Sequence, residues 1–184
     1  MRAFLVLLLA YVLSQFYRAF LAVIAGDLAR DLSLTPAELG NVSAVWFVTF
    51  ALSQFGVGVA LDRIGPRRTV SGLFLVAVIG AIWFSLATSY LQACLAMALI
   101  GVGCSPVLMG SMYYFGRTAP PERFGFLGTM ILGFGSLGNL IGAAPLAWSA
   151  SVIGWRASVV AIAAVTTLSA LLVYLIIRDS ERLT

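Results

Sequence analysis

Hydrophobic residues run almost without interruption through six stretches of this sequence, and polar residues gather in short segments between them. Each stretch reaches the roughly 20 residues that an α-helix needs to cross a bilayer. The pattern therefore predicts an all-α fold, in which residues 1–184 form a single six-helix transmembrane domain of a polytopic membrane protein. The predicted spans are residues 3–25, 38–61, 69–88, 91–115, 123–148 and 157–177.

The segments between the spans carry residues that begin helices. Thr35-Pro36-Ala37-Glu38 has the order of a capping box with proline in the first turn, which predicts the start of the second span. Pro120-Pro121-Glu122 has a similar position before the fifth span, and Gly154-Trp155-Arg156 turns into the sixth. We therefore expect short connections and no second domain.

Composition excludes several functional classes. Hydrophobic residues make up 61% of the 184 and charged residues 10%, against about 25% charged residues in soluble domains. There is no histidine, so an imidazole proton relay and a His-ligated metal are excluded. Cys94 and Cys104 would lie about 15 Å apart along one helix, too far for a disulfide. No nucleophile–base pair or phosphate loop is visible, so we expect neither an enzyme nor a bound cofactor.

Arginines predict the orientation in the membrane. If both termini lie on one side of the membrane, that side holds most of the arginines. Arginine-rich loops mark the cytoplasmic face. We therefore expect cytoplasmic N and C termini in the plasma membrane (the inner membrane of a bacterium). This placement explains the basic excess, so no nucleic-acid partner is expected. The cytoplasmic set is Arg2, Arg63, Arg67, Arg68, Arg117, Arg123, Arg178 and Arg182; Arg30 and Arg156 lie outside, and Arg18 lies within the first span.

The connection between the second and third spans carries the most specific motif. It reads Gly58-Val59-Ala60-Leu61-Asp62-Arg63-Ile64-Gly65-Pro66-Arg67-Arg68. This run resembles the signature loop G-x-x-x-D-R-x-G-x-(R/K)-(R/K) of the major facilitator superfamily. The matching positions are Gly58, Asp62, Arg63, Gly65, Arg67 and Arg68.

The resemblance implies a conformational latch in this loop. Asp62 stands at a helix end, where its carboxylate can meet the positive N-terminus of a helix from another bundle. The neighbouring arginines can pair with acids or anionic headgroups. We expect the loop to hold two bundles in one conformation and to release them in another.

Two further stretches resemble helices of the same superfamily with departures. Residues 99–103 resemble the end of the fourth-helix motif R-x-x-x-G-x-G, but Met97 stands in place of its arginine. The fifth span has the glycine spacing of the family, yet Asn139 follows Gly138 where the antiporter motif has proline. No proton coupling or antiport is predicted from either stretch.

The resemblance covers the whole chain but only the N-terminal half of the usual twelve-helix architecture. It implies a half bundle of two three-helix repeats, with the first and fourth helices lining a cavity and the third and sixth facing lipid. The second and fifth would meet a partner, either a second copy of this chain or another six-helix half. The implied function is transport of a small solute by alternating access, with the lipid bilayer as surroundings.

Arg18 is the most informative candidate for substrate binding. It is the charged residue well inside a span, and Tyr11, Ser14 and Gln15 share its helical arc of roughly 100°. One interpretation is an anion-binding stripe, because arginine binds carboxylate and phosphate bidentately. In a homodimer two such arginines would face each other, which resembles the organophosphate:phosphate antiporters of the superfamily. The alternatives are snorkelling to the interface and a structural hydrogen bond.

Other polar residues near the middle of the spans are weaker candidates for the cavity. Each could contact substrate or form an interhelical hydrogen bond. They are Trp46, Thr49, Ser105, Tyr113 and Asn139.

Two other functional hypotheses stay open. Cys94, Met97 and Cys104 share one side of the fourth helix, and thiolate and thioether ligands suit Cu(I), so soft-metal transport is one alternative to ordinary packing of these side chains. No resident metal site is predicted. The other alternative is an accessory intramembrane subunit of a larger complex.

Overall fold

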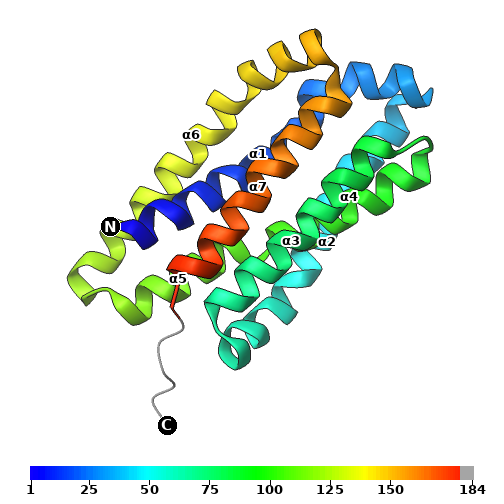
Figure 1. The fold of residues 1–184 in the computed structure, drawn as a ribbon. Coiled ribbons are helices and arrows are strands. Elements are labelled where there is room, and N and C mark those ends of the chain that lie inside the picture. The colour runs from blue at the N-terminus through cyan, green and yellow to red at the C-terminus, as the bar shows by residue number, and fades with distance from the viewer. Residues whose placement is uncertain (179–184) are drawn as a thin grey trace.

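Seven α-helices make up the part of the chain that this computed structural model describes, residues 1–178 without the side chains of residues 140–142. The helices form an elongated bundle with both described chain ends at the same end (Figure 1). They are α1 (Arg2–Leu32), α2 (Pro36–Ile64), α3 (Pro66–Leu86), α4 (Tyr90–Cys104), α5 (Pro106–Thr118), α6 (Pro121–Ile153) and α7 (Trp155–Ile176).

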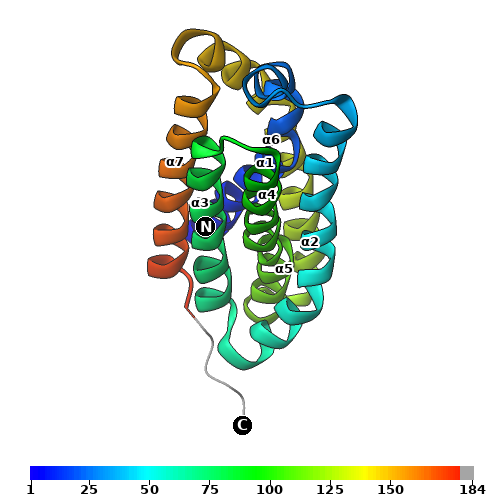
Figure 2. The same cartoon turned by 90° about the vertical axis from the view of Figure 1, so that its right-hand side faces the viewer.

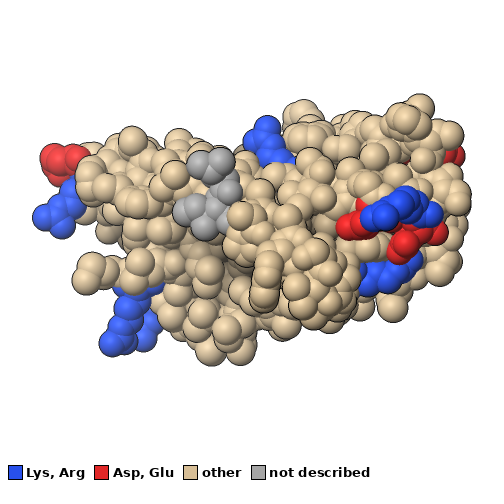
Figure 3. Space-filling view, turned by 90° about the horizontal axis from the view of Figure 1, so that it is seen from above, with Lys and Arg blue, Asp and Glu red and all other residues tan. Residues whose placement is uncertain are grey.

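Six helical stretches are long and apolar enough to cross a membrane, because α4 and α5 together count as one span from Tyr90 to Thr118. The prediction of an all-α protein with six membrane-spanning helices is therefore confirmed. Charged side chains gather toward the two ends of the molecule, and the visible surface between them is almost uncharged (Figure 3).

The helices pack in a definite order. α3 packs against α4 and α7, α1 packs against α6 and α7, and α2 packs against α4. The helices thus follow one another around an open ring in the order α2, α4, α3, α7, α1 and α6, so α2 and α6 are its two flanks. Figure 1 shows α6 along one edge of the bundle, and Figure 2 shows α2 on the side opposite α7. An aromatic ladder ties the core together, since the rings of Tyr17 and Phe20 on α1, Phe84 on α3 and Trp155 on α7 follow one another with centroids 5.5–5.9 Å apart.

Two glycine turns reveal an internal repeat. Gly65 joins α2 to α3 with φ 92° and ψ 164°, and Gly154 joins α6 to α7 with φ 86° and ψ 154°. Positive φ of this size favours glycine, and each turn consists of the single glycine between two helices. The segments α1–α3 and α4–α7 are thus two units of matching layout with three spans each, because α4 and α5 form one span.

Arginines two residues after these glycines tie α3 to α7 at both ends. Arg67 Nε donates to the Tyr174 carbonyl oxygen at 2.6 Å, and its guanidinium lies 4.1 Å from the Tyr174 ring centroid. Arg156 Nη1 donates to the Ser85 carbonyl oxygen, also at 2.6 Å. Both carbonyls belong to a last helical turn, where no intrahelical N–H reaches them.

The fourth span is interrupted at its middle, whereas the sequence pattern predicts one continuous helix over 91–115. Pro106 has no N–H, so the Val102 carbonyl lacks its usual helical partner. Ser105 replaces that partner, because its backbone N–H and its Oγ donate to the Val102 oxygen at 3.3 and 2.7 Å. Ser105 itself keeps helical dihedral angles, φ −60° and ψ −36°, so α4 and α5 together form one span from Tyr90 to Thr118.

The first helix ends at Leu32, later than the predicted residue 25. Its last turns are held by tertiary contacts, since Asp31 Oδ2 accepts a hydrogen bond from Trp155 Nε1 at 2.8 Å and lies 3.7 Å from Arg156 Nε. Ser33 then adopts φ 51° and ends the helix. At the next helix start the predicted capping box is confirmed, with Glu38 N–H donating to Thr35 Oγ1 and Thr35 N–H to Glu38 Oε2.

Candidate functional site

Two helices are only slightly covered by the rest of the bundle. In their most apolar windows 17% of α2 and 19% of α6 residues are buried, against 61% for α1 and for the span from Tyr90 to Thr118. Gly58 on α2 lies on open surface, since a Cβ there would have no neighbour within 4 Å. The flanks of the ring are thus the faces available to a partner.

Arg18 lies between α1 and the exposed side of α2. Its side chain is exposed, and the guanidinium carbon lies 5.4 Å from the centroid of the Phe47 ring. Phe47 is 11 residues into α2, about 16 Å along that helix from Pro36. The guanidinium therefore stays deep in the span, and no salt bridge to Arg18 is found among the described residues.

The other predicted residues of the α1 stripe face inward. Tyr11 and Gln15 are buried, and Gln15 Nε2 donates to the Tyr11 hydroxyl at 2.7 Å. Ser14 Oγ donates to the Cys104 carbonyl at 3.4 Å, at the break between α4 and α5. Ser14 thus links α1 to α4, and the bond between Gln15 and Tyr11 lies within α1. Arg18, at the other edge of the same arc, is the side chain that reaches the open face.

Ser105 and the second helix meet at the same break. The Ser105 carbonyl accepts a hydrogen bond from Gln54 Nε2 on α2 at 3.3 Å. The structure thus brings together predicted residues of the first and fourth spans, Ser14 and Ser105, with a polar side chain of the second. Tyr113 lies apart from them on α5, with the Arg117 guanidinium 4.5 Å from its ring centroid.

Two predicted site residues carry buried polar atoms without a partner. Trp46 is 3% exposed and stacks on Phe50, yet its Nε1 has no hydrogen-bond partner. Asn139 Oδ1 on α6 is likewise buried and unpartnered. Thr49, by contrast, is satisfied locally, since its hydroxyl reaches the Val45 carbonyl at 2.9 Å. Unpaired buried polar atoms are costly and call for a partner from outside the described chain.

The sulfur-bearing residues on α4 belong to its packing. Met97 and Cys104 are buried in the hydrophobic core, and Cys94 is half-buried. Among the described residues, no group of three or more histidines, cysteines or acids gathers at one place.

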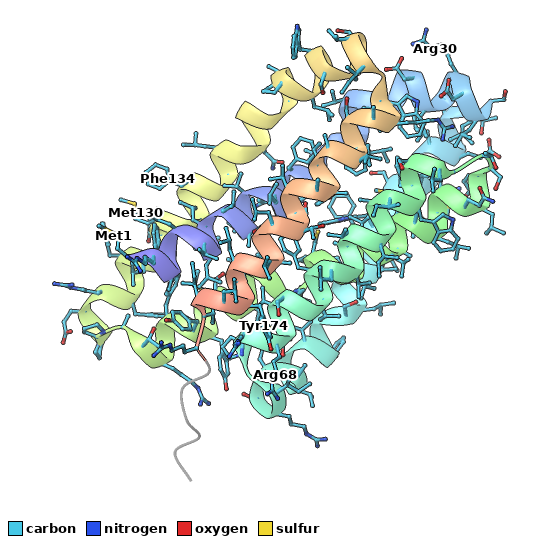
Figure 4. The ribbon with its side chains drawn as sticks, viewed as in Figure 1. Met1, Arg30, Arg68, Met130, Phe134 and Tyr174 are labelled. Carbon is cyan, nitrogen blue, oxygen red and sulfur yellow. The ribbon has the colours of Figure 1, made fainter. Side chains whose placement is uncertain are left out.

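The residues of the predicted latch lie on both sides of the turn at Gly65 and have different surroundings. Asp62, Arg63 and Arg68 are exposed at the arginine-rich end of the bundle, opposite the end that carries Arg30 (Figure 4). Arg67 instead turns back onto α7 and binds Tyr174. Gly65 provides the turn itself.

The profile of the Major Facilitator Superfamily matches residues 7–184. The chain belongs to the Major Facilitator Superfamily. With its six apolar helices it is an integral membrane protein of this transporter family.

Several superfamily transporters are similar to it. The nitrate/nitrite transporter NrtP of Picosynechococcus is 27% identical over 119 residues, which cover 65% of this chain and 22% of the relative. The probable sulfoacetate transporter SauU of Cupriavidus necator is 23% identical over 95% of this chain and 41% of the relative. The hexuronate transporter of Bacillus subtilis is 25% identical over 97% of this chain and 42% of the relative.

Solved structures of the superfamily share the fold. The proton:xylose symporter XylE bound to 6-bromo-6-deoxy-D-glucose superposes with a TM-score of 0.81 at 17% identity, over 97% of this chain and 45% of that one. The inward open XylE from E. coli also gives 0.81, at 19% identity and 48% coverage of that chain. This superfamily chain therefore spans less than half the length of the relatives it matches.

Phe47 is a site neighbour that the sequence reasoning missed. An aromatic side chain on an apolar helix carries no periodic signal of its own. Phe47 could have been found by asking which ring lies opposite Arg18, since arginine in an apolar span often stacks on an aromatic face.

Proposed function

We propose that this chain is one half of an alternating-access transporter for a small anionic solute, and that Arg18 is the side chain that binds the anion. The observation that carries the proposal is the deep, exposed guanidinium of Arg18, which stacks on Phe47 without an acidic partner among the described residues. A charge at this depth is costly unless it faces a water-filled cavity or a counter-ion. An anionic substrate supplies both charge and bidentate acceptors.

Two further features support an anionic solute. Trp46 Nε1, on the same helix as Phe47, is a buried donor that has no hydrogen-bond partner among the described residues. Relatives of this chain are named for nitrate, nitrite, sulfoacetate and hexuronate, which are all anions. The buried side chains of Tyr11, Ser14 and Gln15 would then hold α1 in position. Asn139 would contribute a polar atom from α6.

The second half of the transporter would cover the exposed faces of α2 and α6. A twofold homodimer is the commonest closed assembly and would place two copies of Arg18 on opposite walls of one cavity. Another six-helix half would serve the same purpose. In either assembly the arginine-rich end, with both termini, would face the cytoplasm from the inner membrane.

Asp62 would act as the latch between the two halves. It is exposed at the end of α2, and no salt bridge holds it within residues 1–178. A helix N-terminus of the other half, or an arginine, would be its partner in one conformation of the cycle.

Uptake into proteoliposomes tests the role of Arg18. The purified chain should take up at least one of nitrate, sulfoacetate and hexuronate, and Arg18→Gln should lower the initial rate about ten- to hundredfold because a hydrogen-bonded charge pair is lost. Arg18→Lys should retain part of the rate, since it keeps the charge without the bidentate geometry.

Arg30→Gln is the matched control. It removes an arginine from the same helix at its exposed end, where Arg30 pairs with Asp27. Its rates should equal those of the wild type. Wild-type uptake of every anion by Arg18→Gln would contradict the proposed function.

A further inference from the structure

A groove runs between α2 and α3 at the arginine-rich end of the bundle. Its volume is about 500 Å³, and apolar side chains line most of its length, including Val102 of α4. Gly56 on α2 and Gly72 on α3 keep it open, because a Cβ at either position would have no neighbour within 4 Å. We call this hollow the α2–α3 groove.

One end of the groove is polar. Arg68, which lines it, is exposed and forms no salt bridge with any described residue. Thr69 beside it is 5% exposed, and its hydroxyl oxygen is buried without a hydrogen-bond partner. Ser53, another lining residue, has already donated to the Thr49 carbonyl at 2.6 Å. The Thr69 hydroxyl therefore awaits a partner from outside the described chain.

The start of α3 adds positive potential at the same end. Pro66 is its first helical residue, and no side chain caps the first turn, which also contains Arg68 and Thr69. The free N–H groups of a first turn attract phosphate and other anions. A guanidinium, a helix N-terminus and an unpartnered hydroxyl together have the chemistry of a phosphate site. Figure 4 shows Arg68 at the end of the bundle opposite the end that carries Arg30.

We propose that the α2–α3 groove binds one anionic phospholipid, with its phosphate at Arg68 and Thr69 and an acyl chain between Gly56 and Gly72. The apolar walls suit hydrocarbon, and the polar end suits the headgroup at the membrane surface. Within this groove, charge favours an anionic lipid, because a copy in the same orientation would bring its own arginines next to Arg68. A second copy in the proposed transporter would instead cover the exposed stripe of α2 that carries Leu52, Phe55 and Val59. The lipid site goes beyond the transport of an anion and does not depend on it.

Native mass spectrometry of the purified full chain tests the proposal, with phosphatidylglycerol and phosphatidylcholine of identical acyl chains as probes. We expect one retained phosphatidylglycerol in the wild type and weaker retention of phosphatidylcholine. Arg68→Gln should reduce retention of phosphatidylglycerol about fivefold, as expected for one arginine near an anionic headgroup. Thr69→Val, which keeps the shape of the side chain, should reduce it about threefold.

Two more variants separate the headgroup from the chain. Gly72→Leu should fill the groove and lower retention of both lipids, since open space surrounds a Cβ there. Arg117→Gln is the control, because Arg117 is exposed at the same end and lies outside the groove. It should bind lipid as the wild type does.

Four results would overturn the proposal. The first is equal retention of phosphatidylglycerol by Arg68→Gln and Arg117→Gln, and the second is full retention by Gly72→Leu. The third is complete displacement of the lipid by inorganic phosphate, which would make this a site for the free ion. The fourth is loss of the dimer, but not of the bound lipid, in the Gly72→Leu variant, which would show that the groove binds a second copy of this chain.

Discussion

Single glycines decide how closely the central helices approach one another. A Cβ at Gly103 would overlap the backbone of Ala77 on α3, and a Cβ at Gly101 would overlap Thr49 and the Trp46 carbonyl on α2. α4 therefore packs against both neighbours through backbone contact, which small residues permit between membrane helices. Residues 99–103, singled out by their resemblance to a fourth-helix motif, thus have a packing role in this bundle.

Asp62 should affect the rate of transport through its charge. Asp62→Asn keeps the shape of the side chain but removes the charge that would meet a helix N-terminus or an arginine. We expect initial uptake rates roughly two- to tenfold below wild type, measured in proteoliposomes.

Glu122→Gln provides the matched comparison for that variant. Glu122 is the exposed acid in the first turn of α6, at the same end of the bundle. It should leave the rate unchanged. An Asp62→Asn chain that transports as fast as the Glu122→Gln chain would exclude the latch.

Sequence reasoning identified polar residues within the spans but could not predict their partners. Helical spacing places Tyr11, Ser14, Gln15 and Arg18 on one arc, yet the structure buries three of them and exposes Arg18. The arc of one helix does not say which neighbour covers each edge. That information depends on the packing of α1 against α6 and α7, which is a long-range property.

At the scale of elements, paired arginines join α3 and α7. Arg67 and Arg156 each follow a positive-φ glycine by two residues, and each donates to a carbonyl in the last turn of the other helix. Because the two helices run antiparallel, the ties lie at opposite ends of the pair. The same kind of arginine-to-carbonyl hydrogen bond thus joins the last helices of the two three-span units at both ends.

Each of these ties should contribute to stability. Arg67→Gln and Arg156→Gln should each cost about 1 kcal/mol, since each removes a charge-assisted bond to a half-exposed site. That loss corresponds to a melting temperature lower by about 2–4 °C in a chain of this size. Thermal unfolding in detergent measures it.

The double variant sharpens this experiment. The two losses should add, because the sites lie about one helix length apart. Arg117→Gln should melt with the wild type, as Arg117 stacks on Tyr113 within α5, and within residues 1–178 no hydrogen bond or ion pair joins it to a second helix. Unchanged melting of both single variants would show that the ties contribute nothing.

Elements were predictable where local chemistry fixes them. The capping box at Thr35 and the glycine turn at Gly154 both appear as the sequence indicates. The later end of α1 was not predictable, because it rests on Asp31 meeting Trp155 across 124 residues of sequence. The break at Ser105 has a local cause in Pro106, but the hydropathy pattern alone does not predict it.

At the scale of the molecule, two flanking helices expose faces that a complete transporter would cover. α2 and α6 are the least buried spans, and the relatives of this chain are more than twice its length. The family and the fold of the half bundle follow from motif and hydropathy. Its partner does not, because a face that suits another bundle can serve a copy of itself or a different chain.

The mass of the assembly in lipid nanodiscs shows whether two half bundles pair in the membrane. We expect a species near twice 19.5 kDa, two bundles that together enclose the cavity between their Arg18 side chains. A species at 19.5 kDa, stable in the membrane and never paired with a second bundle, would contradict it.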